Sequence, residues 1–93
     1  MTEGQALRSV ATIINKRGLH ARASAKLVEA AARFKSQITV SKDGTSVDAR
    51  SIMGLMMMGA GVGSQIELCV EGPDANEAMT AILALIAARF GED

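Results

Sequence analysis

The feature that most restricts the fold of this 93-residue chain is an Asp-Gly pair between two short, strand-like segments. Gln37–Lys42 precedes Asp43-Gly44, and Thr45–Ala49 follows it. An Asp-Gly pair between alternating segments is the strongest short-range signal for a β-hairpin, because both residues tolerate the left-handed backbone of a tight turn. The chain is therefore predicted to contain two adjacent antiparallel strands here.

Two further segments are predicted to be strands. Leu7–Ile14 mixes polar residues with β-branched residues. Gln65–Glu71 alternates strictly, with apolar side chains at every second position. Such alternation is typical of a strand that has one face in a core and the other toward solvent.

Three helices are predicted from apolar residues spaced three and four apart. They cover Ala21–Phe34, Ser51–Met58 and a final segment from Ala75 to Phe90. Ser51 is placed as the N-cap of the second helix, and Asp74-Ala75-Asn76-Glu77 has the spacing of a capping box with Asp74 as the cap. The apolar face of the last helix is expected to consist of Ala75, Ala78, Met79, Ile82, Leu83, Ile86 and Phe90.

The order of these elements predicts a two-layer α+β sandwich, in which the helices cover one face of a sheet. A chain of this length supports one core, so residues 1–93 are expected to form a single domain. Gly59, Gly61 and Gly63 are interpreted as a turn, because a dinucleotide loop would have a different spacing and would lead from a strand into a helix.

Charge and composition exclude several kinds of partner. Ten basic residues balance ten acidic ones, and Tyr and Trp are absent, whereas nucleic-acid-binding domains usually have a basic excess and aromatic stacking platforms. A single cysteine fits a reducing compartment, no signal peptide is visible, and no apolar run is long enough to insert into a membrane. A cytoplasmic protein is expected. No metal site is expected, because the chain has one histidine and Cys69 lies on a different predicted element.

That histidine, His20, is placed at the start of the first predicted helix. The amides of Ala21 and Arg22, the helix dipole and the side chains of Lys16, Arg17 and Arg22 would together form an anion site. A neutral imidazole nitrogen is a nucleophile near neutral pH, so it could take a phosphoryl group without a general base. The residues alone also allow, and favour, a structural or surface role for this histidine.

The sequence around His20 resembles the active-site signature of the HPr family, the histidine-containing phosphocarriers of the bacterial phosphotransferase system. GLHAR at residues 18–22 matches the pattern Gly-(Leu/Ile/Met)-His-x-Arg-Pro-Ala, and Ala23 and Ser24 stand at its last two positions. The Ser24 hydroxyl is expected to compete for an amide at the helix start. The stretch DARSIMGLMMMGAGVGSQIELCVEG resembles the second family landmark, a serine that opens a short apolar helix, and 31 positions separate His20 from Ser51.

This resemblance covers nearly the whole chain and implies the open-faced βαββαβα sandwich of the family, with three helices over a four-stranded antiparallel sheet. It also implies a phosphocarrier rather than an enzyme. Enzyme I, charged from phosphoenolpyruvate, would phosphorylate His20, with Nδ1 as the favoured nitrogen, and the group would pass to an enzyme IIA domain. Ala21, Arg22 and Arg17 would bind the phosphoryl group, no cofactor would be needed, and the protein would be a monomer. The run IMGLMMM resembles the nitrogen-related branch of the family more than the sugar branch.

The second landmark carries two further expectations. Ser51 is either a helix cap alone or also a site that an HPr kinase/phosphorylase phosphorylates. The helix after it has more apolar residues than two turns can bury, so Leu55 is expected in the core and several others on a partner-docking surface. That surface consists of Ile52, Met53, Met56 and Met57.

A second class of function fits the same residues. In a small regulatory α+β module, His20 would be only a helix cap, and the protein would act by binding partner proteins or a small anion. Uptake of a phosphoryl group from phosphoenolpyruvate and enzyme I separates the two hypotheses.

Overall fold

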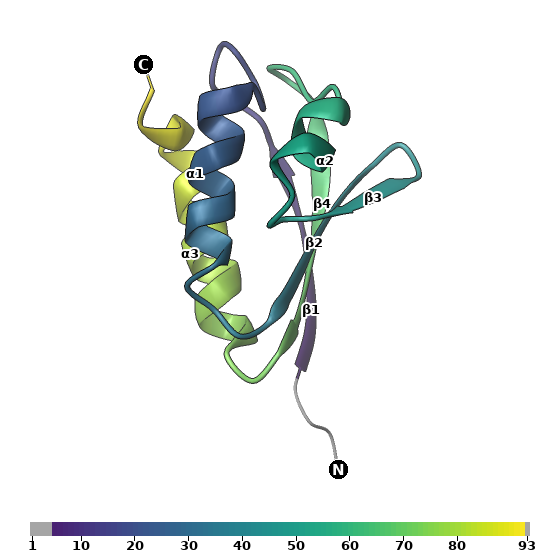
Figure 1. The fold of residues 1–93 in the computed structure, drawn as a ribbon, viewed down its shortest axis with the longest axis vertical. Coiled ribbons are helices and arrows are strands. Elements are labelled where there is room, and N and C mark those ends of the chain that lie inside the picture. The colour runs from purple at the N-terminus through teal and green to yellow at the C-terminus, as the bar shows by residue number, and fades with distance from the viewer. Residues whose placement is uncertain (1–4, 93) are drawn as a thin grey trace.

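A computed structural model of the protein describes residues 5–92 (Figure 1). The elements follow the predicted order, with a short 3-10 helix added at the end. The strands are β1 (Gln5–Thr12), β2 (Gln37–Lys42), β3 (Thr45–Asp48) and β4 (Gln65–Gly72). The helices are α1 (Ala21–Ala31), α2 (Ile52–Met57), α3 (Ala75–Ala87) and the 3-10 helix η1 (Arg89–Gly91).

All strand pairs are antiparallel, and the order across the sheet is β1-β4-β2-β3. The predicted hairpin is confirmed, because Lys42 pairs with Thr45 and the intervening Asp43 and Gly44 have φ angles of 51° and 82°. α1 and α3 lie side by side along one face of the sheet, and α2 packs against α1 and β3 (Figure 1). Because the described helices lie on one side, the fold is the open-faced α+β sandwich that the sequence predicts.

The core lies between the sheet and the helices. Every second residue of β4 points into it, so that Ile66, Leu68 and Val70 are buried. Leu27 of α1 and Ile82 of α3 belong to the same buried cluster. Removing such side chains from water, at roughly 25 cal/mol per Å² of apolar surface, is the main term that holds the layers together.

Several element boundaries differ from those expected. β1 runs from Gln5 to Thr12 rather than from Leu7 to Ile14, and it ends early because the amide and carbonyl of Ile13 bond to the loop before β4. α1 ends at Ala31 rather than at Phe34, because hydrogen bonds to the third preceding residue tighten its last turn. The bounds of β2, β3, β4 and α2 agree with the prediction to within one residue.

The prediction for the last helix is wrong at its C-terminal end. α3 ends at Ala87, and Arg89 and Phe90 have left-handed φ angles of 58° and 55°. A left-handed backbone costs an L-residue roughly 1–2 kcal/mol, so tertiary contacts have to maintain this turn. Phe90 provides one, since its side chain is fully buried. The chain thereby bends back toward the start of α1 (Figure 1).

The predicted capping box is also wrong. Asp74 occupies the N-cap of α3 but makes no side-chain capping hydrogen bond. Its carboxylate accepts hydrogen bonds from the amides of Lys35 and Ser36, both at 2.9 Å, and from the Ser36 hydroxyl at 2.5 Å. These donors, the Ser36 hydroxyl most strongly, hold the pKa of Asp74 below its usual value. Asp74 therefore fastens the start of α3 to the turn between α1 and β2.

Candidate functional site

His20 lies at the N-cap of α1, where the sequence predicts it. Its backbone is extended, with φ −78° and ψ −175°, and its carbonyl accepts the first helical hydrogen bond from the Ser24 amide at 2.8 Å. The imidazole makes no capping hydrogen bond, and 25% of the side chain is exposed. The ring is therefore not acting as a cap, which was the structural alternative. The amides of Ala21, Arg22 and Ala23 belong to the group that a helix start leaves without internal partners.

The loop that carries His20 is supported from two sides. The Leu19 amide donates to the Ala60 carbonyl at 2.9 Å, so the glycine-rich segment interpreted as a turn is also a support for this loop. The Ser24 hydroxyl donates to the Leu19 carbonyl at 3.1 Å. The expectation that Ser24 competes for an amide at the helix start is therefore wrong. Both contacts fix the direction in which the chain enters α1.

A carboxylate that the sequence did not reveal contacts His20. Glu92 Oε2 lies 2.5 Å from the imidazole Nε2, although 72 positions separate the two residues. Asn15 holds the same carboxylate, because its Nδ2 donates to Glu92 Oε1 at 3.0 Å and to the Gly18 carbonyl at 2.9 Å. No local sequence pattern assigns Glu92 or Asn15 to the site, because the contact of Glu92 with Asn15 and His20 depends on the left-handed turn after α3.

The surroundings of Glu92 favour its ionised form. Its pKa is held below the usual value, chiefly by the hydrogen bond from Asn15; burial opposes this effect, and the contact with His20 and the charge of Arg22 add to it. An ionised carboxylate can only accept hydrogen bonds, so the hydrogen of the Nε2 contact belongs to the ring. Nδ1 is then the nitrogen that has a free lone pair in the neutral imidazole.

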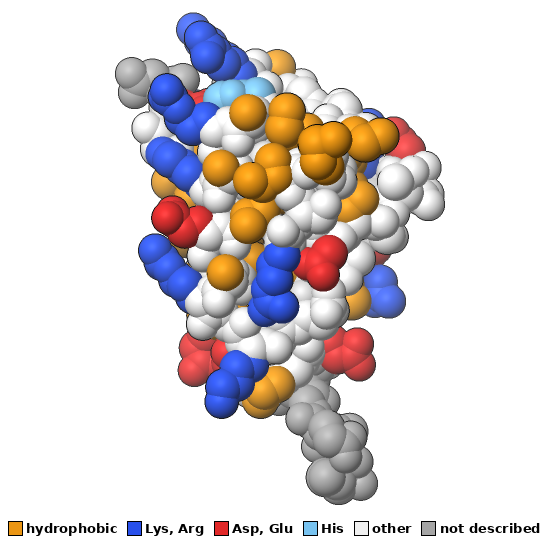
Figure 2. Space-filling view, viewed as in Figure 1, with side chains coloured by type: hydrophobic (Ala, Val, Ile, Leu, Met, Phe, Trp, Pro, Cys, Tyr) orange, Lys and Arg blue, Asp and Glu red, His pale blue; other side chains and the backbone are white. Residues whose placement is uncertain are grey.

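Four cationic side chains surround a hollow beside this pair. Its lining consists of Lys16, Arg17, Arg22, Lys26, Gly91 and Glu92. The sequence predicts the first three cations but not Lys26, which lies one turn after Arg22 and also donates to the Phe90 carbonyl at 2.7 Å. Figure 2 shows lysine and arginine side chains close to the histidine at one end of the molecule. Positive charge next to a helix start suits a small anionic group such as phosphoryl.

The second landmark lies at the same end of the molecule. Ser51 Oγ accepts a hydrogen bond from the Gly54 amide at 3.0 Å, which confirms that Ser51 is the N-cap of α2. Leu55 is fully buried, as predicted. The remaining apolar side chains form an exposed surface, here named the α2 patch, in which Ile52 is 39%, Met53 68%, Met56 42% and Met57 80% exposed. Hydrophobic side chains gather next to the histidine in Figure 2.

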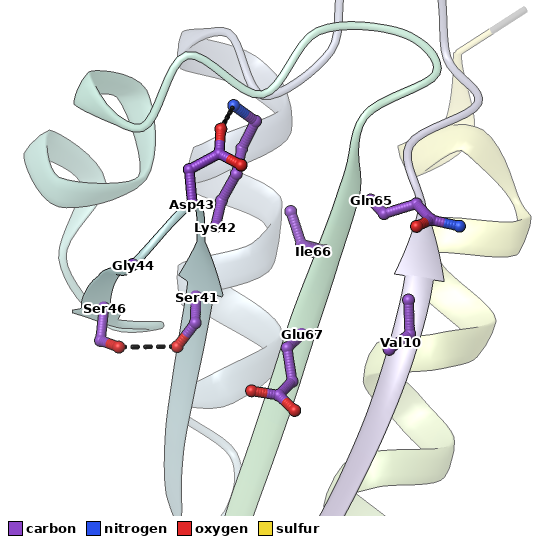
Figure 3. A pocket seen from close by; sticks show the side chains of 9 residues that line it. All are labelled: Val10, Ser41, Lys42, Asp43, Gly44, Ser46, Gln65, Ile66 and Glu67. Atoms are coloured by element: carbon purple, nitrogen blue, oxygen red, sulfur yellow. Dashed lines mark hydrogen bonds and ion pairs between the residues drawn. The ribbon is translucent and has the colours of Figure 1, made fainter.

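The hollow drawn in Figure 3 lies on the open face of the sheet and has no comparable chemistry. Four of its polar side chains pair with one another, since the hydroxyls of Ser41 and Ser46 are 2.7 Å apart and Lys42 donates to Asp43 at 2.8 Å. Among residues 5–92, no three His, Cys, Asp or Glu side chains gather as metal ligands would. Over that same range, no helix is both long and apolar enough to cross a bilayer.

Comparison with known sequences gives matches along most of the chain. Residues 7–88 match the family profile described as the PTS HPr component phosphorylation site. The phosphocarrier protein HPr of Cupriavidus necator is 63% identical over 81 residues, which cover 87% of this chain and 91% of that protein. The phosphocarrier protein HPr of Neisseria meningitidis serogroup A is 50% identical over 86 residues, which cover 92% of this chain and 97% of that protein.

Comparison with solved structures also gives HPr proteins as matches. The crystal structure of HPr-C-His from Thermoanaerobacter tengcongensis superposes with a TM-score of 0.90 at 45% identity, covering 94% of this chain and 98% of that one. The phosphocarrier protein HPr from Bacillus anthracis superposes with a TM-score of 0.84 at 41% identity, covering 87% of this chain and 96% of that one.

Proposed function

Because the chain belongs to the HPr family of the phosphotransferase system, we propose that His20 is the residue on which it carries a phosphoryl group. The protein is a phosphocarrier and not an enzyme. The observation that best supports His20 is its setting. A partly exposed imidazole lies at the start of α1, and the hollow beside it is lined by four cationic side chains.

The proposed transfer needs no general base. The lone pair of an imidazole nitrogen attacks the phosphorus of the phosphorylated donor, and an N–P bond forms as the bond from phosphorus to the donor breaks. The donor group leaves with the electron pair. Arg17, Arg22 and the first amides of α1, including that of Ala21, balance the charge on the phosphoryl oxygens, which is most of what phosphoryl transfer requires. In the second transfer the N–P bond breaks, and its electron pair returns to the ring.

The partners of the protein belong to the phosphotransferase system. Within it, enzyme I is the proposed donor and an enzyme IIA domain the proposed acceptor, and both would dock on the α2 patch. Flexible methionine side chains can adapt to surfaces of different shape, which suits one patch that serves two partners. Both transfers would take place in the cytoplasm, with the protein acting as a monomer.

Phosphorylation of Ser51 by an HPr kinase/phosphorylase stays a prediction. Its hydroxyl oxygen already accepts the Gly54 amide, and phosphate oxygens are stronger acceptors at the start of a helix. Membership of the nitrogen-related branch likewise stays a prediction. The regulatory module without phosphoryl transfer loses the capping role that it gave His20, because the imidazole of His20 makes no hydrogen bond that caps α1.

Mass spectrometry of the intact protein tests the assignment of His20. After incubation with phosphoenolpyruvate and enzyme I, the wild-type protein should gain the mass of one phosphoryl group, and the gain should disappear on mild acid treatment. His20→Ala should gain nothing, whereas Ser51→Ala should gain as much as the wild type. Labelling of His20→Ala at the wild-type level would refute the assignment.

A further inference from the structure

The segment after α3 is folded onto the histidine loop by several separate contacts. Phe90 is fully buried, its carbonyl accepts a hydrogen bond from Lys26 at 2.7 Å, and two successive residues hold left-handed backbone angles. Glu92 lies two positions after Phe90, and only 14% of its side chain is exposed. The fold therefore places this carboxylate against His20 and does not leave it to solvent.

The two oxygens of the Glu92 carboxylate have different partners. Oε1 accepts from Asn15 Nδ2, and Oε2 faces His20 Nε2. The orientation of the Asn15 amide is fixed, because its Nδ2 donates to two acceptors, the Gly18 carbonyl and the Glu92 carboxylate. A flipped amide would place Oδ1, itself an acceptor, against both of these oxygens. Asn15 is fully buried, and its Oδ1 has no hydrogen-bond partner among the described residues. A buried polar atom without a hydrogen-bond partner costs free energy. The Asn15 amide therefore adopts this orientation for the sake of the two hydrogen bonds that Nδ2 donates.

We propose that Glu92, held by Asn15, is a positioning residue that keeps the imidazole proton on Nε2 and so presents Nδ1 of His20 to the phosphoryl donor. This proposal rests on the proposed role of His20. A carboxylate bonded to one ring nitrogen selects the tautomer and orientation of the ring, and it stabilises the positive charge that the ring gains when the other nitrogen reacts.

The group-transfer step is then defined atom by atom. The lone pair of Nδ1 forms the bond to phosphorus, and the donor group leaves with the electron pair of its own broken bond to phosphorus. The proton stays on Nε2 and remains hydrogen-bonded to the Glu92 carboxylate, which balances the positive charge of the imidazolium ring. The same contact persists until Nδ1 releases the phosphoryl group to the acceptor.

Glu92→Ala tests the proposal with three readouts on the full chain. Nitrogen-15 NMR of the imidazole should show the Nε2–H tautomer in the wild type and both tautomers in Glu92→Ala. The rate of phosphorylation by enzyme I and phosphoenolpyruvate should fall roughly 10-fold or more, as for loss of the partner that orients a functional histidine. Correlation of the phosphorus and ring nitrogen signals should place the group on Nδ1 in the wild type and on both nitrogens in the variant.

Two more variants make the outcome specific. Glu29→Ala removes an exposed glutamate from α1 and should match the wild type in all three readouts. Glu92→Gln keeps one oxygen but cannot accept from both Asn15 and His20, so its rate should lie between those of the wild type and Glu92→Ala. An unchanged tautomer and rate in Glu92→Ala, with His20→Ala unlabelled, overturns this proposal and leaves His20 as the carrier. Labelling of His20→Ala would instead overturn the proposed function.

Discussion

Gly18 and Ala60 approach so closely that no side chain fits between them. A Cβ atom on Gly18 would lie 2.3 Å from the Ala60 carbonyl oxygen. The same oxygen accepts the hydrogen bond from the Leu19 amide, directly before His20 in the chain. The position of the imidazole therefore depends on a backbone contact that only glycine permits, since Gly18 also has a φ of 64°.

Gly18→Ala is expected to lower the free energy of unfolding by roughly 2–4 kcal/mol, the sum of backbone strain and a displaced loop. Gly59→Ala is the matched control, because Gly59 has a φ of 71° but no atom within 4 Å of an added Cβ. It should cost only the backbone strain, roughly 1–2 kcal/mol. Urea unfolding measures both values, and equal losses would contradict the importance of the contact with Ala60.

Arg22→Ala is expected to slow phosphoryl uptake from enzyme I roughly 10-fold or more, because a charged donor to the phosphoryl oxygens is lost. The side chain is exposed, so the melting temperature should stay close to that of the wild type. Arg33→Ala, in the turn just after the C-terminal end of α1 and also exposed, is the charge-matched control. Rapid-quench kinetics would show the difference, and equal rates in the two variants would remove Arg22 from the site.

Met53→Lys tests the α2 patch as a docking surface. Val10→Lys introduces a lysine on the open face of the sheet instead, and the side chains of Met53 and Val10 are similarly exposed, at 68% and 63%. We expect Met53→Lys alone to weaken binding of enzyme I, by roughly 10-fold, as for an apolar contact replaced by a charge near the centre of an interface. Titration calorimetry measures the affinities. A comparable loss in Val10→Lys, or a lower melting temperature only in Met53→Lys, would count against the patch.

The stability of the protein should depend on pH through Asp74. Hydrogen bonds from Ser36 and Lys35 lower the pKa of this carboxyl in the folded state. A depressed pKa means that its stabilising effect is present above the unfolded pKa, about 3.9, and is lost as the pH falls through the folded value. Asp74→Asn should therefore be less stable than the wild type near neutral pH, and the difference should shrink below about pH 4. Thermal melts across this range provide the measurement, and a constant difference at every pH would be evidence against the prediction.

Local patterns were sufficient to predict four strands, with β1 displaced by two residues, and the start of each helix. The hairpin follows from Asp43-Gly44, the buried face of β4 from strict alternation, and the α2 cap from Ser51, since each signal lies within a few neighbouring residues. The cations Arg17 and Arg22 were also predictable, because they lie within three positions of His20.

The predictions that were wrong depend on contacts between residues far apart in the chain. The spacing of Asp74 and Glu77 suggests a capping box, yet Ser36 and Lys35 offer the Asp74 carboxylate three hydrogen bonds from another turn. The apolar period that ends at Phe90 suggests one more turn of helix, yet burial of this ring is achieved by a left-handed bend. Tertiary packing decided both outcomes, and no local propensity reports it.

The left-handed bend at Phe90 also matters for anyone who prepares the protein. Removal of only the last few residues, by a carboxypeptidase or an early stop codon, would spare every strand and all three α-helices. Circular dichroism would scarcely register such a loss, while His20 would be without Glu92. An intact mass therefore needs to accompany any batch whose carrier activity is to be compared with another.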